Sequence, residues 1–121
     1  MSKKILYVDD NVKMLNLIKL MLEQAGYVPL IAQTVDEALR LAEGASFGAM
    51  VLDVNLAGDS GVMLMKFLRE NHKGVPVILY SGGEHPQANV EKILTQGANQ
   101  FVQKRNGSEL VAAVKQVCPL G

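Results

Sequence analysis

The residues of this sequence with the clearest capacity for chemistry are five polar side chains at or just past the ends of short apolar runs. They are Asp9, Asp10, Asp53, Ser81 and Lys104. In a parallel sheet, buried strands read as nearly continuous apolar runs, and ligands bind outside the carboxyl ends of the strands. We therefore expect these five side chains to meet at one edge of one sheet.

Three carboxylates at one sheet edge repel one another, and this repulsion predicts a cation between them. At about 5 Å and an effective dielectric constant near 20, each pair of carboxylates costs roughly 3 kcal/mol. A hard divalent cation such as Mg²⁺ takes oxygen ligands, usually a few carboxylates together with water and phosphate oxygens. Lys104 adds a fixed positive charge. The pattern therefore favours a Mg²⁺ site rather than a bare acidic cluster.

The same residues argue against a nucleotide or flavin site. Such a site would place a glycine- or hydroxyl-rich loop after the first strand, where backbone N–H groups bind the phosphate. Here that loop begins with Asp9 and Asp10, which would repel phosphate. Taken singly, the acidic pair is also typical of a helix cap, Ser81 of a turn and Lys104 of a surface. Their joint placement at four strand ends is what indicates a site.

Segments with apolar residues at helical spacing lie between the apolar runs, so that five strands and five helices alternate. Alternation predicts a doubly wound α/β sandwich around a parallel sheet. The second strand is expected at residues 27–32 and the third helix at 61–70. The apolar residues expected to face the core from the first, second and third helices are Met14, Leu15, Leu17, Ile18, Met21, Leu22, Val35, Ala38, Leu39, Ala42, Met63, Leu64, Phe67 and Leu68.

Residues that suit helix ends support these boundaries. Thr34 with Glu37 three residues later predicts a capping box, Pro86 suits the first turn of the fourth helix, and Ser108 is expected to cap the fifth. Glycines suited to closing a helix follow three of the predicted helices: Gly26, Gly44 and Gly97.

Length and composition predict one domain, residues 1–121, with no strong field for nucleic acid or an anionic membrane. The 12 basic residues balance the 12 acidic ones. Cys118 stands alone, which excludes an intramolecular disulfide, suits a reducing compartment and predicts a small buried side chain. No apolar stretch approaches the ~20 residues that cross a bilayer, and no signal-peptide core follows Met1. A cytoplasmic location is therefore expected.

With these motifs in place, the chain resembles the receiver domain of response regulators in two-component signalling, along essentially its whole length. The resemblance implies a flavodoxin-like fold of five βα units in three layers. It also implies that Asp53 accepts a phosphoryl group, and that Asp9, Asp10 and Asp53 bind Mg²⁺ together with the backbone carbonyl of Asn55. A carboxylate is a competent nucleophile toward phosphorus, and the reaction needs mainly positioning and charge neutralisation.

Three further residues match the family in position. The resemblance implies that Ser81 contacts the phosphoryl group, that Lys104 pairs with it and that Phe101 is the switch aromatic. Asp53 would receive its phosphoryl group from the phosphohistidine of a histidine kinase or a histidine phosphotransfer protein. The face formed by the fourth helix, fifth strand and fifth helix would then shift, and an output domain or target protein would read it. The domain would be regulatory, with only intrinsic autophosphorylation and autodephosphorylation, and would bind neither nucleic acid nor membrane directly.

The sequence departs from the family pattern at three places, one of which is the run Asn55-Leu56-Ala57, where the proline common after the acceptor is missing. Arg105 follows Lys104 where the family usually has a proline in a cis peptide; because a cis bond without proline costs ~3 kcal/mol, we expect a trans bond. Gly82 and Gly83 follow Ser81, where the family has larger residues, and this predicts an open approach for water and a short-lived phosphorylated state.

Two other classes of protein share part of this pattern. A haloacid-dehalogenase-like phosphatase also uses a strand-end aspartate with Mg²⁺, but it needs a second aspartate two residues later, where this chain has Asn55. A receiver-like module that only docks to partners usually lacks an acidic residue or the lysine, and both are present here. The residues therefore favour a phosphoacceptor receiver over either alternative.

Overall fold

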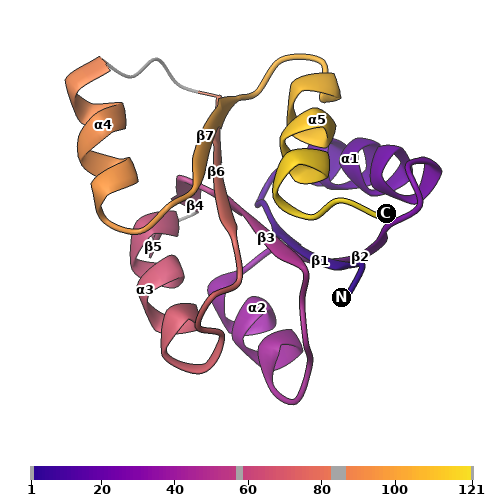
Figure 1. Cartoon of the computed structure of the whole chain (residues 1–121), viewed down its shortest axis with the longest axis horizontal. Coiled ribbons are helices and arrows are strands. Elements are labelled where there is room, and N and C mark those ends of the chain that lie inside the picture. Colours follow the sequence, from indigo (N-terminus) through magenta and orange to yellow (C-terminus); the bar gives the residue numbers. More distant parts are fainter. Residues whose placement is uncertain (1, 57–58, 83–86, 121) are drawn as a thin grey trace.

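A five-stranded parallel sheet forms the centre of the protein (Figure 1). The computed structural model describes residues 2–56, 59–82 and 87–120. The strands lie in the spatial order β2 (Val28–Ala32), β1 (Lys4–Val8), β3 (Ala49–Asp53), β6 (Val77–Ser81) and β7 (Gln100–Gln103). This order, in which the chain winds first to one side of β1 and then to the other, confirms the predicted doubly wound, flavodoxin-like sheet.

The helices cover both faces of this sheet and complete three layers (Figure 1). One face carries α1 (Val12–Gln24) and α5 (Ser108–Val117), and the other carries α2 (Val35–Ala42), α3 (Gly61–Asn71) and α4 (Gln87–Thr95). The sheet therefore separates two apolar cores, one under each helical layer.

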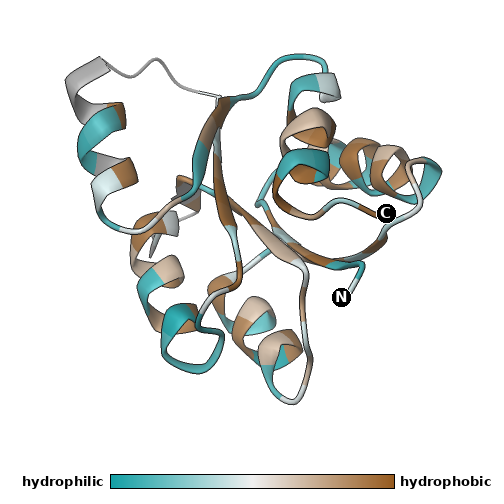
Figure 2. Cartoon of the chain, in the orientation of Figure 1, coloured by the Kyte–Doolittle hydropathy of each residue, from teal (hydrophilic) through white to brown (hydrophobic). Residues whose placement is uncertain are grey.

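Successive residues of the central strands enter the two cores alternately. Ile5 and Tyr7 pack against α1 and α5, whereas Leu6 and Val8 pack against α2 and α3. Every residue of β3 and β6 is buried. Because both faces of the sheet are covered, these strands read as continuous apolar runs, and Figure 2 shows them as hydrophobic along most of their length.

Three residues predicted to face the core are exposed instead. Leu17 of α1 is 42% exposed, and Met63 and Phe67 of α3 are 49% and 51% exposed. In α3 the buried stripe is Gly61, Leu64, Met65 and Leu68, rotated by about one residue from the predicted stripe. Adjacent apolar residues leave this rotation ambiguous in sequence; in the structure the buried stripe begins at Gly61, which lies against the Asp53 backbone.

The helix caps match the prediction in one case and contradict it in another. Thr34 Oγ1 accepts a hydrogen bond from the Glu37 N–H at 3.1 Å, which is the first half of the expected capping box. Ser108 is not the cap of α5 but its first residue, and Gly107 holds the cap position with φ 86°. The Asn106 Oδ1 accepts from the Ser108 N–H at 3.1 Å instead. Pro86 lies outside the described residues.

A short hairpin that the sequence did not predict lies between β3 and α3. Its strands are β4 (Asn55–Leu56) and β5 (Asp59–Ser60), paired antiparallel. The Ser60 side chain then caps α3 by accepting from the Val62 N–H at 3.2 Å. The hairpin turns the chain sharply after the end of β3.

The C-terminal end of α4 is tied to its surroundings by Arg69 of α3. Its Nη2 donates to the carbonyl oxygen of Gly97 at 2.6 Å and to Asn99 Oδ1 at 3.3 Å. The same Asn99 oxygen accepts from the Val77 N–H at 2.9 Å, at the start of β6. One guanidinium and one amide therefore join α3, the end of α4 and the central sheet.

Cys118 follows α5 and is 1% exposed, which confirms the predicted small buried side chain. Burial raises the pKa of its thiol. The Tyr27 hydroxyl donates to the Cys118 carbonyl oxygen at 2.7 Å and so ties the chain after α5 to the start of β2. Within the described ranges, the helices are too short or too polar to span a bilayer.

Candidate functional site

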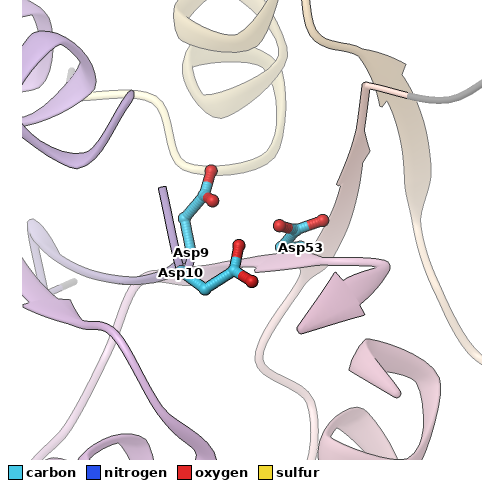
Figure 3. A group of neighbouring side chains, drawn as sticks. All are labelled: Asp9, Asp10 and Asp53. Atoms are coloured by element: carbon cyan, nitrogen blue, oxygen red, sulfur yellow. The ribbon is translucent and has the colours of Figure 1, made fainter. Parts of the chain in front are cut away.

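The five polar residues singled out in the sequence lie at the carboxyl edge of the sheet. Asp9 and Asp10 follow β1, Asp53 and Ser81 end β3 and β6, and Lys104 follows β7. Figure 3 shows the three aspartates gathered at this edge, with the Asp10 carboxyl group directed toward Asp53. One carboxylate oxygen from each aspartate lies within 4.8 Å of the others. Parallel pairing of β1 with β3 produces this grouping, because Val8 lies opposite Leu52 and the next residues are Asp9 and Asp53.

Two of the three carboxylates are buried, and Lys104 offsets their charge. Asp9 is 0% and Asp53 4% exposed, whereas Asp10 is exposed. The Lys104 ammonium lies 2.7 Å from Asp9 Oδ2 and 3.0 Å from Asp53 Oδ2. Burial lowers the pKa of Lys104, but hydrogen bonds and charges from Asp9 and Asp53 outweigh it and raise this pKa above its usual value. The ammonium therefore remains charged, and it compensates the charge of two buried carboxylates.

Asp9 accepts a hydrogen bond on each of its carboxylate oxygens. Its Oδ1 accepts from the Asn11 N–H at 3.0 Å, and its Oδ2 accepts from the Tyr7 hydroxyl at 2.7 Å as well as from Lys104. Asn11 in turn caps α1 by accepting from the Met14 N–H at 3.2 Å. The orientation of this carboxylate is thus set by its own strand and by the start of the next helix.

Tyr7 is the residue of this site that the sequence reasoning missed. A signal was present, because a phenol in the aliphatic strand 5–8 needs a hydrogen-bond partner when buried. Residues two apart in a strand point to the same face of the sheet, so Tyr7 and Asp9 share a face and Asp9 is the nearest polar partner for the Tyr7 hydroxyl. Burial, followed by the hydrogen bond to Asp9, raises the pKa of Tyr7 far above its ordinary value, so its hydroxyl stays a donor.

A second buried tyrosine lies beside the first. The rings of Tyr7 and Tyr80 meet edge-on, with centroids 6.4 Å apart and planes at 61°. Lys104 Nζ lies 5.6 Å from the centroid of the Tyr80 ring. Burial, with a smaller contribution from Asp9, raises the pKa of Tyr80 to about 12. Its hydroxyl is buried and has no hydrogen-bond partner among the described residues.

The backbone holds Asp53 in a narrow space. Asp53 pairs with Tyr80 in the sheet, the Val54 N–H donates to the Tyr80 carbonyl at 3.1 Å, and the Gly61 N–H donates to the Val54 carbonyl at 3.0 Å. A Cβ atom at Gly61 would lie 1.9 Å from the Asp53 carbonyl oxygen. A glycine is therefore required at position 61 for the chain to return against the end of β3.

The remaining predicted residues lie around this centre. Ser81 is 0% exposed, and its carbonyl accepts from the Lys104 N–H at 2.7 Å, which links the segments after β6 and β7. Phe101 is half-buried in β7 and packs against the core under α2 and α3. Asn55 begins β4, directly beyond Val54. The metal-binding role of its carbonyl stays a prediction.

Two of the departures from the family pattern, at Arg105 and at Gly82, lie within the described residues. The Lys104–Arg105 peptide is trans, as expected. A Cβ atom at Gly82 would lie 3.6 Å from Lys104 Cδ, an ordinary contact. Gly83, on which the expected openness to water also depends, lies outside the described residues.

Comparison with known proteins identifies the family. A family model described as the response regulator receiver domain matches residues 5–115. The chain belongs to this family. Among curated proteins, it is 34% identical over 118 residues to the regulatory protein VanR of Enterococcus faecium, covering 95% of this chain and 49% of VanR. The chain thus spans about half the length of this relative.

Two solved receiver structures are similar throughout the fold. The response regulator TrrA of Thermotoga maritima, in complex with Mg²⁺ and BeF, is 28% identical with a TM-score of 0.82, covering 97% of this chain and 99% of TrrA. A response regulator of Burkholderia pseudomallei with a phosphorylated aspartic acid, a calcium ion and citrate is 28% identical with a TM-score of 0.83, covering 93% of this chain and 66% of that one. Family membership favours the receiver over the phosphatase, and places the chain in a regulatory family of two-component systems.

Proposed function

We propose that residues 1–121 form one phosphoacceptor receiver domain, and that Asp53 receives the phosphoryl group. The observation that carries this proposal is the position of the Asp53 carboxylate. It ends a strand that is buried along its whole length and lies 3.0 Å from the Lys104 ammonium, with the other two carboxylates within 4.8 Å. The phosphorylated aspartic acid in the B. pseudomallei relative supports the same chemistry.

The three carboxylates fit a Mg²⁺ ion, and the T. maritima relative is known in complex with Mg²⁺ and BeF. Asp9, Asp10 and Asp53 supply the hard oxygen donors that Mg²⁺ prefers, and we propose the Asn55 carbonyl as a further ligand. When bound, Mg²⁺ would neutralise charge on the oxygens of the phosphoryl group. Asp10 is exposed and so offers its carboxylate to an ion arriving from solvent.

The transfer itself is a displacement at phosphorus. A carboxylate oxygen of Asp53 forms the new O–P bond, the N–P bond of a donor phosphohistidine breaks, and its electron pair returns to the imidazole nitrogen. The donor would belong to a histidine kinase or a histidine phosphotransfer protein. Apart from intrinsic phosphorylation by small donors and its own hydrolysis, the domain would catalyse nothing.

Charge on the product provides the signal. The aspartyl-phosphate carries about two negative charges, which attract the Lys104 ammonium and the Ser81 hydroxyl. Because the Lys104 N–H and the Ser81 carbonyl are hydrogen-bonded, the segments after β6 and β7 would respond together. Phe101 would then turn inward, and the face of α4, β7 and α5 would shift in population toward a form that an output domain or target protein recognises.

Intact-mass spectrometry after incubation with acetyl phosphate and Mg²⁺ tests this function. The wild type should gain one phosphoryl group and Asp53→Asn none. Asp36→Asn, which removes an exposed carboxylate of α2, serves as the matched control and should be labelled like the wild type. Equal labelling of Asp53→Asn would refute the acceptor assignment, and a wild type that takes no label would favour the docking-only alternative.

A further inference from the structure

The hydrogen bonds of Asp9 Oδ2 suggest a role for Tyr7 that goes beyond packing. This one oxygen accepts from the Tyr7 hydroxyl at 2.7 Å and contacts the Lys104 ammonium at 2.7 Å. Lys104 also reaches Asp53 Oδ2 at 3.0 Å. The four side chains thus form a continuous chain of polar contacts from the buried phenol to the strand-end carboxylate of β3.

We propose that Tyr7 is a positioning residue of the phosphoacceptor site, which holds Asp9 in place when Lys104 turns toward the phosphoryl group on Asp53. The inference rests on the proposed function of Asp53. Tyr7 itself touches no reacting atom, and it acts through the carboxylate of Asp9.

A buried carboxylate is destabilised when its cation moves away. Asp9 is 0% exposed, and a buried carboxylate that loses a partner incurs a large desolvation cost. With Tyr7 present, Oδ2 keeps a strong hydrogen bond from a phenol whose own ring is fully buried and fixed by its strand. Without it, Lys104 would be the one remaining donor to Oδ2 among the described residues, and moving the ammonium would cost more free energy.

Removing the Tyr7 hydroxyl should therefore penalise the phosphorylated form more than the resting form. Beryllium fluoride in the presence of Mg²⁺ is a suitable probe, because it occupies the position of a phosphoryl group on a carboxylate. Tyr7→Phe keeps the ring and its edge-on contact with Tyr80 and deletes only the donor. We expect the affinity for beryllium fluoride to fall about tenfold, the lower end of the range for groups that support a metal-site carboxylate.

Tyr27→Phe is a matched control for loss of stability alone. It deletes a buried phenol hydroxyl with a hydrogen bond of the same length, 2.7 Å, but the acceptor is the Cys118 carbonyl, away from the site. Isothermal titration with beryllium fluoride at saturating Mg²⁺ compares the three proteins, and thermal unfolding without Mg²⁺ shows that each one is folded. Tyr27→Phe should bind like the wild type even though its unfolding temperature falls.

A double-mutant cycle tests whether Tyr7 acts through Asp9. In an Asp9→Ala background, Tyr7→Phe should change the affinity for beryllium fluoride by less than about twofold, because the mediating carboxylate is gone. Equal affinities of wild type and Tyr7→Phe would overturn the inference while leaving the function of Asp53 intact. An equal loss in Tyr27→Phe, or a tenfold loss that persists without Asp9, would also overturn it. Failure of the wild type to bind beryllium fluoride would overturn the proposed function and this inference with it.

Discussion

The Tyr80 hydroxyl offers a sharp test of the physical argument, because the described structure gives it no hydrogen-bond partner. Tyr80 is 0% exposed and packs edge-on against Tyr7, which is equally buried. Leaving a buried hydroxyl unsatisfied costs about 1–3 kcal/mol in proteins. Tyr80→Phe removes that cost and keeps the ring, at the expense of a void the size of one oxygen atom.

We therefore expect Tyr80→Phe to raise the free energy of unfolding by about 1 kcal/mol. For a chain of 121 residues, this corresponds to a rise in melting temperature of about 4 °C. Tyr7→Phe makes the same chemical change 6.4 Å away but deletes a hydrogen bond to a carboxylate, and should lower the free energy of unfolding by about 1.5–3 kcal/mol. Two phenols in the same core should thus give effects of opposite sign.

Urea unfolding followed by far-ultraviolet circular dichroism, without Mg²⁺, measures both values. A loss of stability in Tyr80→Phe as large as that in Tyr7→Phe would contradict this expectation. The Tyr80 hydroxyl would then be making a hydrogen bond as valuable as the one between Tyr7 and Asp9.

Three other outcomes follow from the site. Gly61→Ala should lower the free energy of unfolding by about 3 kcal/mol in chemical unfolding, because its Cβ would lie 1.9 Å from a backbone oxygen. Gly82→Ala should leave that free energy unchanged, because its Cβ would lie 3.6 Å from the nearest atom. Similar losses of stability in both variants would contradict the packing argument. Asp10→Asn should weaken Mg²⁺ binding at least about tenfold in calorimetric titration and slow phosphorylation in parallel, and an unchanged titration would remove this residue from the metal site. Because burial raises the pKa of Tyr27 and, to about 12, of Tyr80, the folded state favours the neutral phenols. The stability they contribute should be complete below the unfolded pKa near 10.0 and should be lost as the pH rises toward 12, so tyrosinate absorbance should appear together with unfolding and not before it.

The sheet and its polar edge could be predicted because they depend on strong and local constraints. A strand covered on both faces must be apolar at every position, so β3 and β6 are visible as runs that end in Asp53 and Ser81. A polar residue at the end of such a run lies at the edge of the sheet, where its side chain can reach solvent or a ligand. Parallel order then brings these ends to one edge without further information.

The helix faces and the cap of α5 were harder to predict because they depend on contacts distant in sequence. Phe67 and Leu68 are both apolar, so their types do not decide which one turns inward; in the structure Leu68 is buried, on the same face as Gly61, which lies against Asp53. Gly107 holds the cap position before α5, where a Cβ atom would lie 2.7 Å from Met21 Sδ, an atom of the facing helix. The contact between Tyr7 and Asp9 was local, and was missed because the tyrosine was counted with the aliphatic residues of its strand.

The contacts of Arg69 have a mechanical consequence for α4. Its guanidinium, together with Asn99, fastens the chain at Gly97 to α3 and to the first residue of β6. A helix that is anchored at one end can rotate about that end more easily than it can translate, and displacements then grow along its length toward the opposite terminus. Residues near Gln87, at the end closer to the carboxyl edge of the sheet, would therefore travel farthest, while those near Thr95 would serve as the pivot. In such an arrangement the anchor determines which end of the helix moves most, whatever force begins the movement.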